Sequence, residues 1–132
     1  MPAFEVQTRE RVVFVDITAQ VSAAVAESVV RDGVVVVYVP HTTAGVTINE
    51  NADPSVRSDM KLALERMVPQ SLLFTHAEGN ADAHVKASLM GSSVSVPLAD
   101  GRLQLGTWQG VFFAEFDGPR RRRVLVSLLA AR

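Results

Sequence analysis

The stretch Val34 to Val39 (VVVVYV) decides the fold, and the polar run Pro40-His41-Thr42-Thr43 follows it directly. A continuous apolar run of β-branched residues is typical of a strand that is buried on both faces. Asp32-Gly33 precedes it, and Gly33 suits the left-handed position after a helix. We therefore expect a helix to end at Gly33, a buried strand to follow, and polar residues to gather after that strand.

The residues before this strand alternate between strand and helix patterns. Residues 4–8 and 11–17 alternate or are rich in β-branched residues, which predicts two strands. Thr18 is a candidate helix cap. The helix after it has its apolar or small face at helical spacing, on Val21, Ala24, Val25, Ser28 and Val29.

The residues after the apolar run continue this mixture. Residues 46–49 alternate as a strand, and Asp53-Pro54 is a helix start that Pro69 ends. The apolar face of this second helix comprises Met60, Ala63, Leu64 and Met67. A short helix opens at Asn80 or Asp82 and ends at Gly91, and Asp100-Gly101 is a hairpin turn signal. The remaining strand patterns lie at 94–96, 103–105, 108–116 and 124–128. The order predicts one α+β domain over residues 1–132, with helices packed on antiparallel sheets.

Composition excludes several classes of function. The 132 residues carry 13 Lys+Arg against 14 Asp+Glu, so overall charge attracts neither nucleic acid nor an anionic membrane. The absence of cysteine excludes disulfides, thiolate catalysis and cysteine metal sites. No apolar run approaches the ~20 residues that span a bilayer, and no secretory signal pattern opens the sequence. We expect a soluble, cytoplasmic protein.

All three histidines lie in polar segments that packing does not require. His41 follows the apolar strand, whereas His76 and His84 flank the run Glu78-Gly79-Asn80. Three neutral imidazoles and a water make an open catalytic zinc site, in which bound water becomes hydroxide near neutral pH. The alternative is three unrelated histidines, each hydrogen-bonded locally, because the spacing is not that of a helical zinc motif.

The acidic residues near these histidines can be assigned several roles. Asp53 and Asp82 are explained as helix caps. Glu78 has no such structural explanation, and it fits a general base, a partner that orients a histidine, or a plain loop carboxylate.

Two further features are candidates for a binding site. The tetrad Arg120 to Arg123 is the one dense positive patch, and in a strand alternate arginines face opposite sides. Two of them then point at a phosphate site, or the tetrad forms a solvated sheet edge. Trp108 is either a core residue, as physics alone favours, or the floor of a ligand pocket.

Several long motifs occur in a fixed order. They are His41-Thr42-Thr43, Thr47-Ile48-Asn49-Glu50-Asn51-Ala52-Asp53-Pro54, His76-x-Glu78-Gly79-Asn80, Ala83-His84-x-Lys86, Gly91-Ser92-Ser93, Gly106-Thr107-Trp108-Gln109-Gly110 and Glu115-Phe116-Asp117-Gly118-Pro119-Arg120. With these motifs the chain resembles the YjbQ family, also called the secondary thiamine-phosphate synthase family. The resemblance implies a homotrimer of small α+β subunits with a polar site near the subunit boundary. It also implies joining a hydroxymethylpyrimidine diphosphate to a thiazole phosphate with loss of pyrophosphate, while the physiological task of the family is poorly settled.

The residues and the resemblance together support two hypotheses. The first is a metal-assisted enzyme for a small phosphorylated heterocycle. In it His41, His76 and His84 hold zinc or magnesium, and the catalytic residues are Glu78, His84 and His41. Substrate would contact Asn49, Glu50, Trp108 and Arg120. The second is a non-catalytic trimer that binds a small anion or metabolite through arginines and loop amides.

Overall fold

The computed structural model describes residues 2–132 of the chain. These residues form three helices and eight strands. In chain order they are β1 (Ala3–Gln7), β2 (Val13–Asp16), α1 (Thr18–Ala26), β3 (Gly33–Tyr38), β4 (Ala44–Glu50), α2 (Pro54–Met67), α3 (Ala81–Met90), β5 (Ser93–Ala99), β6 (Arg102–Leu103), β7 (Gln109–Glu115) and β8 (Arg121–Ala130).

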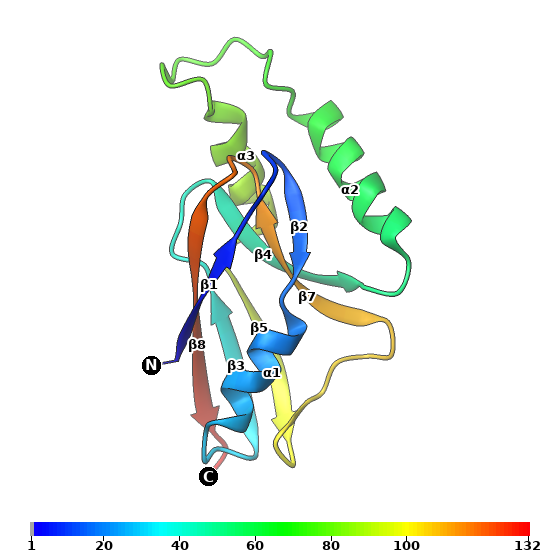
Figure 1. Ribbon diagram of the computed structural model, residues 1–132, viewed down its shortest axis with the longest axis vertical. Coiled ribbons are helices and arrows are strands. Elements are labelled where there is room, and N and C mark those ends of the chain that lie inside the picture. The colour runs from blue at the N-terminus through cyan, green and yellow to red at the C-terminus, as the bar shows by residue number, and fades with distance from the viewer. Residues whose placement is uncertain (1) are drawn as a thin grey trace.

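The strands form two antiparallel sheets, which confirms the predicted α+β class. One sheet has the order β1-β8-β3-β5-β6 and the other has the order β2-β7-β4. Figure 1 shows α1 beside the larger sheet and the segment between α2 and α3 arching over one end of the molecule. The predicted hairpin turn at Asp100-Gly101 joins β5 to β6, and both residues have positive φ, at 52° and 73°.

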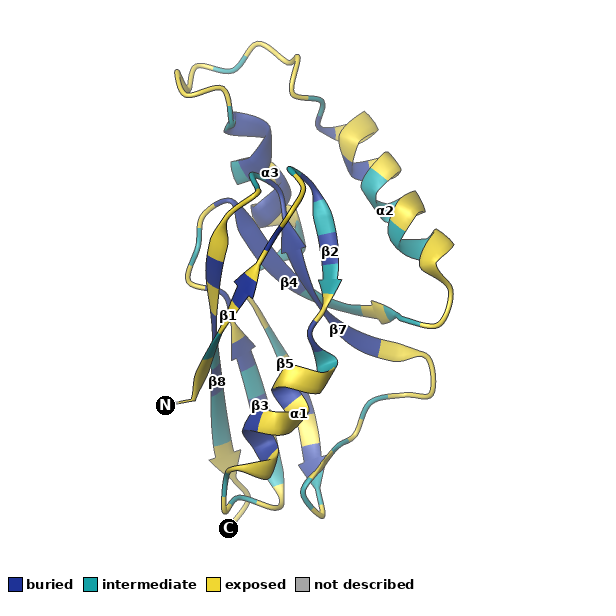
Figure 2. Cartoon of the chain, viewed as in Figure 1, coloured by how far each residue is buried: buried dark blue, intermediate teal, exposed yellow. Residues whose placement is uncertain are grey.

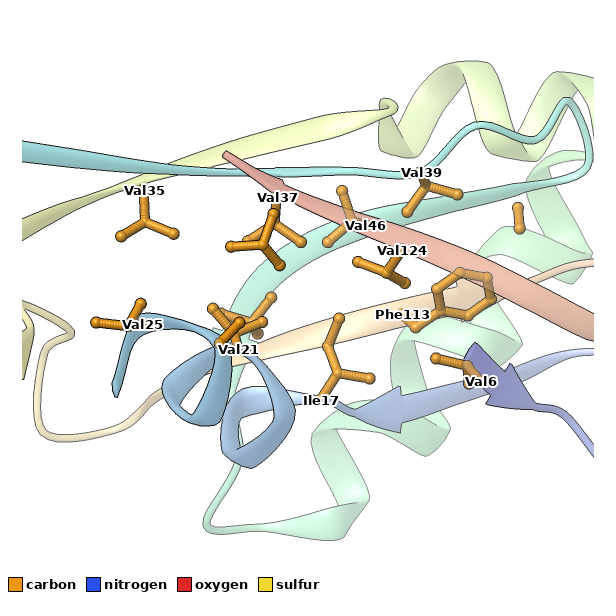
Figure 3. Packing of buried hydrophobic residues seen from close by; sticks show 14 of the residues in the cluster. Val6, Ile17, Val21, Val25, Val35, Val37, Val39, Val46, Phe113 and Val124 are labelled. Atoms are coloured by element: carbon orange, nitrogen blue, oxygen red, sulfur yellow. The ribbon is translucent and has the colours of Figure 1, made fainter. Parts of the chain in front are cut away.

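The main core lies between the larger sheet, α1 and one face of the smaller sheet. Val35 and Val37 of β3 are fully buried there against Val21 of α1 and Phe113 of β7. Figure 3 shows these side chains pointing toward one another from separate elements. The predicted β-branched strand therefore supplies the centre of the core.

A second core lies on the opposite face of the smaller sheet. Phe112 and Ala114 of β7 are buried there with Ala83 and Ala87 of α3 and Leu64 of α2. Figure 2 shows that α3 is largely buried, whereas most of α2 is exposed. The smaller sheet is consequently a middle layer, covered on both faces.

The apolar run 34–39 is buried on one face only, so the prediction of burial on both faces is wrong. Val34 and Tyr38 are 37% and 45% exposed, because the outer face of the larger sheet carries no helix in the described residues. The strand covered on both faces is β7, where Val111, Phe112, Phe113 and Ala114 are all buried. Both strands are continuous apolar runs in the sequence, so only the order of the layers in the fold shows which of the two is covered on both faces.

The first helix is shorter than its sequence pattern. It ends at Ala26, Val29 is 94% exposed, and the Ser28 hydroxyl accepts a hydrogen bond from the Val30 amide at 3.0 Å. Thr18 lies inside the helix and Ile17 holds the cap position, so the predicted cap is wrong. Asp53 does cap α2 by accepting from the Ser55 amide at 2.9 Å. Met67, expected on the apolar face of α2, is 64% exposed.

One glycine contact fixes α3 against the smaller sheet. A Cβ on Gly45 of β4 would lie 2.5 Å from the carbonyl oxygen of Gly91, the residue that ends α3. That carbonyl accepts a hydrogen bond from the Val46 amide at 3.1 Å. The C-terminal end of α3 therefore rests directly on β4, which sets the position of His84 about two turns earlier.

Candidate functional site

The three histidines converge on one cavity of about 710 Å³. His41 comes from the loop after β3, His76 from the segment between α2 and α3, and His84 from the first turns of α3. Figure 1 shows these segments and the turn before β8 at the same end of the molecule. The other lining residues are Tyr38, Pro40, Thr42, Thr43, Glu78, Asn80, Arg120 and Arg122. We call this space the charged lobe.

The ring of His41 is anchored to the backbone of β8. Its Nε2 atom accepts a hydrogen bond from the amide of Arg123 at 2.9 Å. An Nε2 lone pair used in this way places the proton of the neutral ring on Nδ1, which is then a donor. Burial lowers the pKa of His41 below its ordinary value of 6.5, and the charge of Arg122 lowers it further. His41 is thus a neutral hydrogen-bond donor near pH 7.

His76 and His84 form a pair across the charged lobe. Their ring centroids are 5.2 Å apart with planes at 77°, an edge-to-face arrangement. The Nε2 atom of His76 also lies 4.0 Å from Oε1 of Glu78, which is 75% exposed. Glu78 is therefore placed beside a histidine, but 4.0 Å is too long for a hydrogen bond between the two side chains.

A buried network of polar side chains supports the wall of the charged lobe. The Arg122 guanidinium donates to both carboxylate oxygens of Glu115 and to Oγ1 of Thr43, the last at 2.9 Å. Thr8 donates to Glu115 at 2.8 Å, and Glu115 is fully buried. The network joins β7 and β8 to the residue that follows β1 and to the residue that precedes β4. Arg122 itself also lines the cavity.

A second arginine reaches the charged lobe from the turn before β8. Arg120 pairs with Asp117 at 3.0 Å, and Asp117 also accepts from the side-chain amide of Asn80 at 2.9 Å. Burial alone would raise the pKa of Asp117, but the hydrogen bonds from Asn80 and Arg120 outweigh it and lower the pKa. The alternation expected in the tetrad is confirmed, because Arg122 is buried whereas Arg121 and Arg123 are exposed. The alternative of a solvated edge stays open for Arg121 and Arg123, because β8 pairs only with β1 there and its pairing with β3 begins at Leu125.

The three histidines do not form a metal-binding set in this arrangement. Among residues 2–132, no three His, Cys, Asp or Glu side chains lie close enough together to hold one ion. His41 already uses Nε2 for the Arg123 amide. We therefore derive no chemical step through a metal from this geometry.

Three predicted substrate contacts lie elsewhere in the chain. Asn49 and Glu50 end β4 opposite Gly110 and Gln109, and the backbone of Asn51 bonds to that of Trp108. His41 lies just before the other end of β4, so about 20 Å of strand separates the two groups. Trp108 is 62% exposed, so the core prediction is wrong, and it does not line the charged lobe.

Lys86 and Asp82 have a structural role that the sequence did not reveal. Asp82, interpreted as a helix cap, is fully buried and accepts from Lys86 at 2.9 Å and Arg11 at 3.0 Å. The cap position of α3 belongs to Asn80. Lys86 is itself 1% exposed, and the ion pair of Asp82 with Arg11 fixes α3, and with it His84, to the connection between β1 and β2.

Several lining residues were missed by sequence reasoning. Tyr38 carries no signal by type, whereas Thr43 and Asn80 stand in the sequence only as members of longer motifs, because such residues are common at strand ends and helix starts. Glu115, which lies behind the cavity wall, does carry a sequence signal, since it is the charged residue in the otherwise apolar run Val111–Phe116. A carboxylate in a two-sided buried strand needs a buried partner, and Arg122 is that partner.

The fold and the site together define a class: single-domain α+β proteins with a histidine- and arginine-lined cavity at the ends of their strands. The family model described as UPF0047 protein YjbQ-like matches residues 2–131. The chain therefore belongs to the YjbQ/UPF0047 family. Within residues 2–132, no helix combines the length and apolar character that a membrane crossing requires.

Relatives and solved structures agree with this assignment. The chain is 54% identical over 126 residues to a UPF0047 protein of Methanocaldococcus jannaschii, covering 96% of this chain and 91% of that protein. It is 44% identical over 130 residues to YugU of Bacillus subtilis, covering 98% of each chain. A crystal structure of an uncharacterized YjbQ/UPF0047 protein from Clostridium acetobutylicum superposes with a TM-score of 0.96 at 50% identity, covering 98% of this chain and 100% of that one.

Proposed function

We propose that the charged lobe is an enzyme active site for a small phosphorylated molecule. The observation that supports this most strongly is the convergence of His41, His76 and His84 on one cavity with Arg120 and Arg122. These residues come from four separate parts of the chain, and a packed core does not need the three histidines or Arg120. Paired imidazoles with a carboxylate nearby are suited to proton transfer, and guanidinium groups are suited to phosphate oxygens.

The proposed roles follow from the surroundings of each group. His76 and His84 face each other across the lobe and act as acid and base, with Glu78 beside His76. His41 donates from Nδ1 because Nε2 is occupied. Arg120 and Arg122 orient phosphate oxygens, but each is already paired with a carboxylate, so directed hydrogen bonds rather than net charge hold the anion.

The specific reaction is carried over from the family resemblance as a proposal. It joins a hydroxymethylpyrimidine diphosphate to a thiazole phosphate and releases pyrophosphate. The test is pyrophosphate release by the purified protein, with and without Mg²⁺, beside the variants His84→Ala and Arg120→Gln. We expect His84→Ala to lower the rate by about 10²–10⁴-fold, the usual contribution of a positioned acid or base.

Arg121→Gln is the matched control, because Arg121 lies next to Arg120, is exposed, and pairs loosely with Glu5 at 3.4 Å. It should leave the rate unchanged. Equal losses in His84→Ala and Arg121→Gln, or no turnover of these substrates by the unaltered protein, would refute the reaction.

A non-catalytic binding protein is the second candidate. It is favoured by the arginines and threonines that line the charged lobe and by the exposure of Glu78. Calorimetry with phosphate and pyrophosphate decides between the candidates: binding without turnover of any phosphorylated substrate supports the second.

Three expectations from the sequence remain predictions. The sequence expectation is a zinc or magnesium ion held by His41, His76 and His84, and elemental analysis of the protein beside a variant with all three histidines changed to alanine tests it. The homotrimer finds support in Val34, Tyr38 and Leu129, which are exposed on the outer face of the larger sheet. Light scattering should give three times the 14.3 kDa of one chain. A cytoplasmic location is tested by cell fractionation.

A further inference from the structure

A second cavity of about 490 Å³ adjoins the charged lobe. The two cavities share the side chains of His41, Thr42 and His84. The remaining lining of the second cavity comes from Ala44, Ala87, Ser88, Gly91 and Ser92. We call this space the neutral lobe, because its lining within the described residues includes no Asp, Glu, Lys or Arg.

Small residues hold the neutral lobe open. Gly91 has a φ of +95°, which L side chains rarely adopt, and a Cβ built there meets nothing within 4 Å. The space over Gly91 is therefore open, and a side chain at this position would occupy it. Gly45 lets the end of α3 rest on β4, so Ala44 and Ala87 line the neutral lobe where these two elements meet.

The polar groups of the neutral lobe are hydroxyls. Thr42, Ser88 and Ser92 are exposed, and the Ser88 hydroxyl donates to the carbonyl of His84 at 3.0 Å. A serine hydroxyl that donates in this way still accepts from a ligand. Hydroxyls without ionised neighbours favour an uncharged polar ligand, since they offer no counter-charge to an ion.

We propose that the neutral lobe binds the organic part of a phosphomonoester whose phosphate lies in the charged lobe. The ligand class is a phosphate ester of an uncharged polar group, such as a sugar or other polyol. His41 and His84 stand at the junction of the two lobes and so face the bond between phosphate and organic part. The inference rests on the proposed function, because it takes the charged lobe as the phosphate site.

The test compares two probes on the full chain. Inorganic phosphate fills the charged lobe alone, whereas ribose 5-phosphate also places a neutral group beyond His41 and His84. By calorimetry we expect ribose 5-phosphate to bind at least about tenfold more tightly, as one or two added hydrogen bonds provide. Equal affinity for the two probes would overturn the proposal.

A variant that fills the neutral lobe sharpens the comparison. Ser88→Leu places a branched side chain in this lobe and should abolish the advantage of ribose 5-phosphate while changing phosphate affinity by less than about twofold. Ser58→Leu is the matched control, because Ser58 is also an exposed helical serine that donates to the carbonyl four residues earlier. Ser88→Ala separates the loss of the hydroxyl from the loss of space. A Ser88→Leu variant that keeps the advantage would contradict the proposal.

Chemical-shift mapping on the unaltered protein gives an answer without any variant. Both probes should shift the amides of Thr43 and Arg122, and ribose 5-phosphate alone should also shift those of Gly91 and Ser92. Shifts confined to the charged lobe with both probes would refute the neutral lobe but leave the proposed function intact. No shift and no heat with either probe would refute the phosphate site, and the inference with it.

Discussion

Replacing Asp82 of α3 by asparagine removes the carboxylate that Arg11 and Lys86 share. Asp82 is fully buried, Lys86 is 1% exposed, and the two atoms Oδ2 and Nζ are 2.9 Å apart. Asparagine keeps the shape but leaves the Lys86 ammonium buried without its counter-charge. Breaking a buried pair in this way costs about 3–5 kcal/mol. That loss is a large fraction of the 5–15 kcal/mol that stabilises a typical domain.

The assay is urea unfolding of the unaltered protein and of Asp82→Asn over a range of pH. Burial alone would raise the pKa of Asp82, but the hydrogen bonds from Arg11 and Lys86 outweigh it and lower the pKa below the ordinary 3.8. When folding lowers the pKa of a carboxyl group, the group stabilises the folded protein fully at any pH above its pKa in the unfolded chain. This stabilisation is lost as the pH falls through its pKa in the folded protein. The gap between the two proteins should therefore close below about pH 4.

Two controls separate the buried charge from general disruption. Asp82→Asn/Lys86→Met removes both partners and should recover most of the loss, because an apolar replacement of a buried pair is often neutral. Arg11→Gln should cost no more than about 1 kcal/mol, since the Arg11 side chain is 34% exposed. An Asp82→Asn cost below about 1 kcal/mol, or a double variant as unstable as the single one, would refute the reasoning.

Three more outcomes are expected. Gly45→Ala should lower the free energy of unfolding by about 1–3 kcal/mol because its Cβ meets the Gly91 carbonyl at 2.5 Å, and an unchanged urea midpoint would contradict this. An NMR titration should find the pKa of His41 below 6.5, because burial and the charge of Arg122 disfavour the protonated ring. The free energy of unfolding should then rise with pH between the pKa of His41 in the folded protein and 6.5. This rise should be absent in His41→Gln. Trp108→Ala should leave phosphate affinity unchanged in calorimetry, because the side chain lies outside the charged lobe.

Local signals predicted the elements well where one residue type decides the conformation. Asp53-Pro54 starts α2 and Asp100-Gly101 turns between β5 and β6, as the sequence indicates. These features depend on contacts within a few residues, such as the Asp53 carboxylate on the Ser55 amide. The end of α1 was missed because Ser28 and Val29 continue the helical spacing although the chain has already turned.

The candidate site was predicted in part. His41, His76, His84, Glu78 and Arg120 do share a cavity, because the segments that carry them end on the same side of the fold. Asn49, Glu50 and Trp108 lie at the far end of β4, although His41 and Glu50 are only nine residues apart in sequence. A strand separates its two ends by about 3.3 Å per residue, so neighbours in sequence become distant in space.

The sequence by itself determined the class of fold, the turn positions and which residues bear chemistry, because these depend on local conformation and on residue type. Tertiary structure alone decided that β7 rather than β3 is covered on both faces, and that Glu115 accepts hydrogen bonds from Arg122. It also decided that the histidines stand between a charged and a neutral lobe. The physical reason is that these outcomes depend on strand register and layer order, which contacts between residues far apart in the chain establish.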